Sequence, residues 1–305
     1  MKEKQGHRRY TGLYSAGTLQ TRARELNDAL SCCRLCPRNC GVNRLREERG
    51  VCNTGSRAAV SSFSAHYGEE KPISGVYGSG TIFFTSCNLL CNFCQNYDIS
   101  HSGRGTELDD EELAGLMLEL QERGCHNINL VTPTHVVPQI MSALVIAVSR
   151  GLTIPLVYNT GAYDLVSTLK YLEGIIDIYM PDFKFWSQKL SVQTCNINDY
   201  RDVAVKAISE MYRQAGDLVC DDRGIAVRGL LLRHLVMPGH PGNTKHILDW
   251  VSSQLSKDTY LNIMDQYYPA GKIAGNEKLS RTLGRTEFRK ALEYARELGL
   301  QRLEY

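Results

Sequence analysis

The sequence predicts an α/β protein: a partial (β/α)6 barrel of the TIM type that carries a cysteine-rich N-terminal extension. From residue 81 onward, six short runs rich in β-branched and aromatic residues alternate with longer segments of helical period, which is typical of parallel βα units. The chain has 305 residues, enough for one barrel and an appendage, and its 43% hydrophobic and 22% charged residues are typical of a globular protein. We therefore expect the extension over residues 1–60 and the barrel over residues 61–305.

The expected strands read TIFFT, NINLV, IPLVY, IIDIYM, GLLLRHLVM and YLNIMD, and they begin at residues 81, 127, 154, 175, 229 and 260. Helices are expected between and after them, over residues 109–124, 138–151, 163–174, 199–216, 244–256 and 285–299. The first helix has Thr106 or Asp109 as its N-cap and stops at Gly124. Six right-handed βα units close most, but not all, of an eight-stranded barrel.

Polar segments follow the strands directly. The first strand is followed by a cysteine triplet, and the next five are followed by TPTH, NTGAY, PDFK, PGHPGN and QYYPAG. Ligands of such folds bind at the carboxyl ends of the strands. We therefore expect the functional site at this end of the barrel.

The N-terminal residues predict a reducing compartment, and that compartment decides how the cysteines are interpreted. Residues 1–17 lack the apolar core of a signal peptide, and the longest apolar run, residues 136–148, is too short to span a bilayer. We therefore expect a cytoplasmic protein without a membrane partner. Eleven cysteines in that compartment favour metal or redox chemistry over a disulfide framework.

The loop after the first strand holds Cys87, Cys91 and Cys94 in the spacing C-x3-C-x-F-C. Three thiolates can bind three irons of a [4Fe-4S] cluster and leave the fourth iron open to an external ligand such as S-adenosylmethionine (SAM). The alternative is a structural zinc site with its fourth ligand elsewhere. The position of the triplet, after the first of six strands, favours the cluster.

This motif, with Phe93 before the third cysteine, resembles the signature of the radical SAM enzymes. The resemblance implies that a reduced [4Fe-4S] cluster cleaves SAM to methionine and a 5'-deoxyadenosyl radical, which abstracts a hydrogen atom from a substrate. It also implies that Phe93 lies near the adenine and that the cluster receives its electron from a donor such as flavodoxin or ferredoxin.

A narrower resemblance covers residues 30–270. It is to the pyruvate formate-lyase ([formate-C-acetyltransferase]) activating enzymes, and it is carried by residues 68–100, 131–140, 158–164, 177–185 and 228–239. It implies that the hydrogen comes from a glycine of a partner glycyl-radical enzyme. A small molecule or a peptide side chain is the alternative substrate within the same chemistry.

A rival from a different class is a non-catalytic metal- or nucleic-acid-binding protein. Residues 1–50 hold 11 Lys and Arg against 5 Asp and Glu, which would suit an acidic partner. We disfavour nucleic acid, because no aromatic residues alternate with these charges as a stacking platform would require.

Further roles follow from the narrower resemblance, one position at a time. Asp182 and Lys184 match an M-x-D-x-K segment that lies near the methionine carboxylate of SAM. Asn159 stands where the activating enzymes have aspartate, which removes one charge and puts in doubt a cation site built there. The Gly-Gly-Glu segment that holds the SAM amino group is absent. The resemblance therefore leaves that amine to backbone carbonyls near Thr132, together with Thr134 or His135.

A second cysteine group lies in the extension. Its spacing is C-x2-C-x3-C-x11-C, and its members are Cys33, Cys36, Cys40 and Cys52. Four thiols suit a second [4Fe-4S] cluster or zinc, and the third alternative is that they bind no metal. A metal held by all four would have no open position, so it would serve structure or electron transfer.

Overall fold

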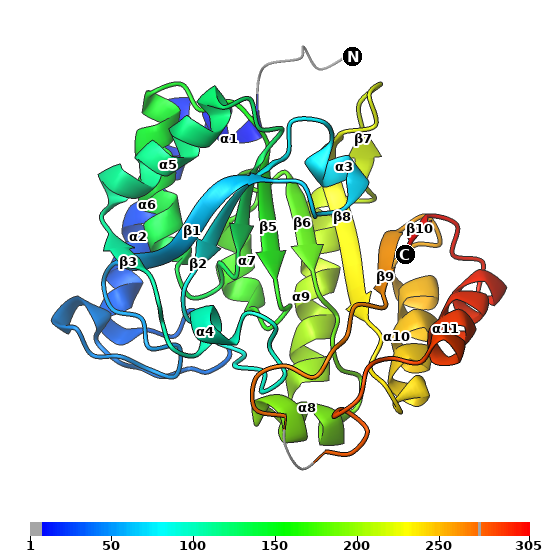
Figure 1. Ribbon diagram of the computed structural model, residues 1–305. Helices are drawn as coiled ribbons and strands as arrows, with labels where there is room; N and C mark the ends of the chain where they lie inside the picture. The colour runs from blue at the N-terminus through cyan, green and yellow to red at the C-terminus, as the bar shows by residue number, and fades with distance from the viewer. Residues whose placement is uncertain (1–7, 274–275) are drawn as a thin grey trace.

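The computed structural model describes residues 8–273 and 276–305, and Figure 1 shows an open, largely parallel sheet flanked by helices. Six parallel strands stand where six were predicted, which confirms the fold class: β2 (Ser79–Phe84), β4 (Ile128–Val131), β5 (Leu156–Thr160), β6 (Ile178–Pro181), β8 (Ala226–Leu235) and β9 (Tyr260–Met264). Neighbours in this order are hydrogen-bonded in parallel. The third and fourth begin later than predicted, at Leu156 and Ile178, and residues 175 and 176 still hydrogen-bond back to Leu172.

Six helices also lie at their predicted places: α5 (Asp110–Glu122), α6 (Val137–Ser149), α7 (Val166–Tyr171), α9 (Tyr200–Ala215), α10 (Pro241–Gln254) and α11 (Arg285–Glu297). Asp109, not Thr106, is the N-cap of α5, since its side chain accepts the backbone N–H of Glu112 in a capping box. Gly124 follows that helix with φ +83°, a left-handed conformation that ends it. The helix α7 is shorter than its predicted range.

The sequence did not predict the strands that border the parallel core. They are β1 (Ala58–His66), antiparallel to β2; β3 (Thr106–Leu108), antiparallel to β1; β7 (Val219–Cys220), antiparallel to β8; and β10 (Leu303–Glu304), parallel to β9. Their small and polar residues give weak local strand signals, so pairing with a neighbour stabilises them. Together, β1 and β3 cover the edge that β2 would otherwise expose.

The first helices, α1 (Arg9–Ser15) and α2 (Thr18–Asp28), pack against the barrel near α6. The buried face of α2 is formed by Leu19, Ala23 and Leu26, which are spaced as one side of a helix. Asn27 Nδ2 donates to Ser142 Oγ of α6 at 2.6 Å. The extension is therefore fixed to the barrel before its cysteines are reached.

The cysteine-rich stretch that follows contains two short 3-10 turns, η1 (Ala29–Cys32) and η2 (Arg44–Arg46). The remaining helices are α3 (Lys71–Ser74), α4 (Tyr97–Ser100) and α8 (Gln188–Cys195). In Figure 1 the strand arrows point toward the end where α4, α8 and the orange segment after β9 gather. Within the described residues, no helix is long and apolar enough to cross a membrane.

Candidate functional site

The residues that face the inside of the barrel change from apolar to polar toward the carboxyl ends of the strands. Side chains two residues apart on a strand share a face. Val157, Met180 and Leu231 are buried together in an apolar cluster. Two positions later on the same three chain segments come Asn159, Asp182 and Arg233. This pattern places a polar group at the end where the sequence predicted the site.

Arg233 is the centre of this polar group. Its Nε donates to Oδ1 of Asp182 at 2.7 Å, and its Nη2 donates to Oδ1 of Asn159 at 2.7 Å. The side chain is only 13% exposed. A fixed guanidinium thus lies between Asn159 and Asp182. It is next to Asn159, the position at which the resemblance put a cation site in doubt.

Lys184 shares the carboxylate of Asp182 with Arg233. Its Nζ donates to Oδ2 of Asp182, and its side chain is 16% exposed. Burial alone would lower the pKa of Lys184, but Asp182 and Cys91 outweigh it and hold that pKa above its usual range. For Asp182 the effects are reversed: burial would raise its pKa, but the positive charges of Arg233 and Lys184 hold that pKa below its usual range. Both groups are therefore charged.

Two glutamates extend the network. Arg233 Nη1 lies 3.3 Å from Oε2 of Glu69 and 3.8 Å from Oε1 of Glu70. Asn129 Nδ2 donates to Oε1 of Glu69 at 3.1 Å, and Asn262 Nδ2 donates to Oε1 of Glu70 at 2.8 Å. Burial raises the pKa of Glu69, and Arg233 opposes that effect. These contacts join the segment after β1 to β4, β8 and β9.

The cysteine triplet lies on the loop that follows β2. Burial raises the pKa of the Cys87 thiol to about 12 and also raises that of Cys94, while the charge of Lys184 opposes the rise at Cys94. The N–H of Leu89 lies 3.3 Å from Cys87 Sγ. The structure thus brings the triplet together with Lys184, although 90 residues separate Cys94 from Lys184 in the sequence.

The donor set at this loop fits a [4Fe-4S] cluster with one open iron. Three cysteines supply three thiolates, and a backbone N–H points to one of the sulfurs, as is common around such clusters. In the part of the chain that the structure describes, no three His, Cys, Asp or Glu side chains are gathered as ligands of a single metal ion. A four-iron cluster holds each sulfur on a different iron, so it needs a wider spacing than one ion does.

Phe93 is buried in an aromatic cluster next to the triplet. Its ring stands edge-on to Phe185 at a centroid distance of 6.0 Å and is tilted against Tyr267 at 5.9 Å. Phe185 comes from the segment after β6, and Tyr267 from the segment after β9. The segments after three strands therefore meet at Phe93. That Phe93 lies near the adenine of SAM stays a prediction.

Three residues of the TPTH segment after β4 have different environments. Thr134 Oγ1 donates to Oδ1 of the buried Asp164 at 2.8 Å. His135 Nε2 lies 2.8 Å from the carbonyl of Thr85, and burial lowers its pKa to about 4, so the ring is neutral. Thr132 has φ +61°, an unusual value for a β-branched residue that is often found at ligand sites. Of these residues, Thr132 best suits the expected role of presenting a backbone carbonyl.

The cysteines of the extension lie beside the triplet loop. Burial raises the pKa of Cys36 to about 12, with smaller contributions from Cys52 and Cys33, so these three thiols are neighbours. Arg38 Nε donates to the carbonyl of Asn88 at 2.7 Å, within the triplet loop. Cys40 Sγ lies 3.5 Å from the N–H of Val51.

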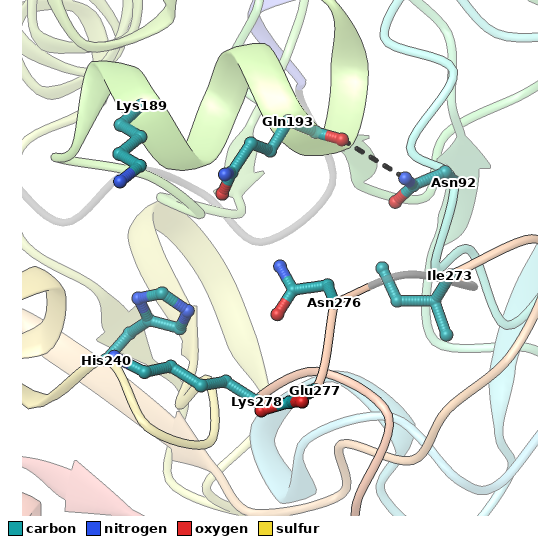
Figure 2. A pocket seen from close by; sticks show the side chains of 8 residues that line it. All are labelled: Asn92, Lys189, Gln193, His240, Ile273, Asn276, Glu277 and Lys278. Carbon is teal, nitrogen blue, oxygen red and sulfur yellow. Dashed lines mark hydrogen bonds between the residues drawn. The ribbon is translucent and has the colours of Figure 1, made fainter.

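A cavity of about 420 Å³ opens beside the triplet loop, between α8 and the segment after β9 (Figure 2). Lys189 and Gln193 reach into it from α8, and Asn276 faces them from the other side. Lys278 and His240 add positive and polar character, against one carboxylate, Glu277. The lining is completed by Asn92 and Ile273.

A partial barrel that presents three cysteines and a charged lysine at its strand ends defines a cofactor-binding α/β-barrel enzyme. The family described as the Radical SAM superfamily matches residues 81–251. A protein of Methanocaldococcus jannaschii, described as uncharacterized, is 31% identical over 278 residues, which are 88% of this chain and 75% of that protein. The chain belongs to the radical SAM superfamily and is a radical SAM enzyme, and its family implies a [4Fe-4S] cluster and SAM.

Sequence reasoning missed several residues of this site. Arg233 and Glu69 lie in segments that carry the narrower resemblance, but the sequence predicts no role for them, and Cys195 lies outside both predicted cysteine groups. A charged residue in the middle of the apolar strand GLLLRHLVM was the signal for Arg233, because a buried cation requires a buried partner.

Proposed function

We propose that this enzyme cleaves SAM reductively and that the resulting radical abstracts a hydrogen atom from a glycine of a partner glycyl-radical enzyme. The observation that carries the cleavage is the meeting of the triplet with the Lys184–Asp182 pair at the strand ends. The cluster supplies one electron, and SAM supplies the radical precursor. The glycine substrate is supported by the likeness of residues 68–100 and 228–239 to the activating enzymes.

In this proposal the protein holds and orients SAM. Lys184 binds the SAM carboxylate as a charged donor, and Asp182 keeps the Lys184 ammonium in place. Arg233 fixes Asp182 through a short contact, so that the pair does not rotate away. Backbone at Thr132 receives the SAM amine, and Phe93 packs near the adenine. Buried walls exclude water and competing hydrogen donors.

The test begins with anaerobically reconstituted protein, SAM and dithionite. We expect slow formation of 5'-deoxyadenosine without substrate, measured by chromatography. Adding the protein fraction of a cell extract should then produce a persistent organic radical detectable by electron paramagnetic resonance. No 5'-deoxyadenosine from protein with a full cluster would contradict the cleavage itself.

The cavity favours a second candidate substrate, a small molecule. Its volume of about 420 Å³ lies within the range of small-ligand sites. The lysines in its lining suit a molecule with an acidic group. If only the low-molecular-weight filtrate of the extract increases 5'-deoxyadenosine formation, and no protein radical appears, the small-molecule substrate replaces the glycine.

We further propose that the extension binds a second [4Fe-4S] cluster through Cys33, Cys36, Cys40 and Cys52. Support comes from the neighbouring thiols of three of these residues and from their location beside the triplet loop. A cluster there would lie on the path of an electron from flavodoxin or ferredoxin to the radical site.

A further inference from the structure

Cys195 is a buried cysteine that belongs to neither cysteine group. It ends α8, and its side chain is directed at the triplet loop: Cys195 Sγ lies 3.2 Å from Cys91 Sγ, with Cys195 as the donor. The two residues are separated by 104 positions in the sequence, so the folded barrel alone creates this contact.

Two hydrogen bonds join α8 directly to the loop around this contact, and Arg38 bridges them with two more. The backbone N–H of Asn92 donates to the carbonyl of Thr194 at 2.8 Å, and Asn92 Nδ2 donates to the carbonyl of Gln193 at 3.2 Å, as Figure 2 shows. Arg38 Nη2 lies 3.3 Å from the carbonyl of Cys195 and 3.2 Å from that of Leu89. The backbone that carries Cys195 is thus fixed against the triplet loop.

We propose that Cys195 is a positioning residue that donates its S–H to the sulfur of Cys91 and thereby raises the reduction potential of the cluster. A reduced cluster carries more negative charge on its sulfurs, so a hydrogen-bond donor stabilises the reduced form more than the oxidised form. The donor is neutral and buried, and it therefore acts without adding a charge that would compete with SAM. This inference rests on Cys91 as an iron ligand, as in the proposed function.

The test is a redox titration of the reconstituted protein, followed by electron paramagnetic resonance. Cys195→Ala should shift the potential to more negative values, and Cys195→Ser, which keeps a hydrogen donor, should restore part of the difference. Cys125→Ala is the matched control, because Cys125 is also buried but precedes β4 at the opposite end of the strands. Equal potentials in wild type and Cys195→Ala would overturn the proposal.

Equilibrium dialysis of SAM with the same variants distinguishes a different role. If Cys195 instead bound the fourth iron, Cys195→Ala would raise the affinity for SAM by opening that iron, whereas the hydrogen-bond role leaves that affinity unchanged. That result would overturn the hydrogen-bond role. Failure of the proposed function is recognised separately, since it would appear as wild-type protein that holds a cluster but forms no 5'-deoxyadenosine.

A second measurement covers the case in which Cys195→Ala fails to assemble a cluster. In the cluster-free full chain, the oxidant diamide should join Cys91 and Cys195 in a disulfide, with the two thiols losing two electrons and two protons to diamide. Peptide mass spectrometry should find this cross-link in wild type and in Cys125→Ala. Cross-links within the triplet without any to Cys195 would show that the contact does not exist and would overturn the proposal.

Discussion

The two cysteine groups lie side by side but have different cations around them. Near the triplet, Lys184 is bound through a carboxylate, so its ammonium keeps other hydrogens for a ligand. In the extension, Arg44 donates to the carbonyls of Gly55 and His135, and its Nη1 also lies 3.8 Å from Cys33 Sγ. Arg38 donates to the carbonyl of Asn88. These arginines bind mainly backbone carbonyls. We therefore expect a ligand beside the triplet, whereas the arginines of the extension fasten it to the barrel.

The thiols of the two groups do not differ in burial. Cys91 and Cys52 are buried, and the other members of both groups, Cys87, Cys94, Cys33, Cys36 and Cys40, are half-buried. Cysteine spacing alone would also give both groups the same weight as metal sites. The cations around them separate the two groups, and the following experiments test that separation.

The largest expected effect is on the triplet. Cys87→Ala, Cys91→Ala and Cys94→Ala should each abolish SAM cleavage, because a cluster needs all three thiolates to leave one open iron. The measurement is 5'-deoxyadenosine formed under anaerobic reduction. Cys125→Ala is the control and should cleave SAM at the wild-type rate. Full activity in any one triplet variant would mean that the cluster is bound elsewhere.

Much of this arrangement was predictable from local patterns. The six strands have β-branched runs bounded by turns, and Asp109 precedes an acidic first helical turn, so both were found from short-range chemistry. Cys87 and its two partners were predicted as cluster ligands from their spacing and from their position after the first strand. These features do not depend on how the barrel closes.

The other contacts of the site depend on how distant segments of the chain come together in the folded barrel. Arg233 contacts Asp182 and Glu69 only because β8 lies next to β6 and the segment after β1 folds back against β8. Thr134 was expected to serve the SAM amine in place of an absent segment, yet its hydroxyl donates to Asp164, a partner that no local pattern indicates. Contacts between distant segments are set by the tertiary fold, which periodicity cannot encode.

The next effect concerns the ligand-facing cation. Lys184→Ala should weaken SAM binding by roughly ten- to hundredfold, since a lost charge-assisted contact costs about 1.5 to 3 kcal/mol. Equilibrium dialysis with the reconstituted protein measures it, and the iron content should not change. Lys170→Ala, an exposed lysine of α7, is the control. Unchanged affinity in Lys184→Ala would remove this residue from the SAM site.

A smaller effect is expected for a cation that is committed to the backbone. Arg38→Ala should lower the free energy of unfolding of the cluster-free chain by about 1 to 3 kcal/mol, because its partner carbonyls lose a charged donor. Urea unfolding followed by circular dichroism measures it. Arg46→Ala, an exposed neighbour, should stay within about 0.5 kcal/mol of wild type. If both variants matched wild type, the extension would not be fastened through Arg38.

The smallest change, about twofold, is expected in total iron when the triplet alone is removed. With Cys87, Cys91 and Cys94 all replaced by Ala, the proposed cluster of the extension should remain, so iron and sulfide should fall to about one [4Fe-4S] per chain. The remaining cluster should not respond to SAM, since four thiolates leave no open iron. Stoichiometric zinc without sulfide would instead identify a structural zinc site. A folded variant without metal would show that these four cysteines bind no metal, and would overturn the proposed cluster of the extension.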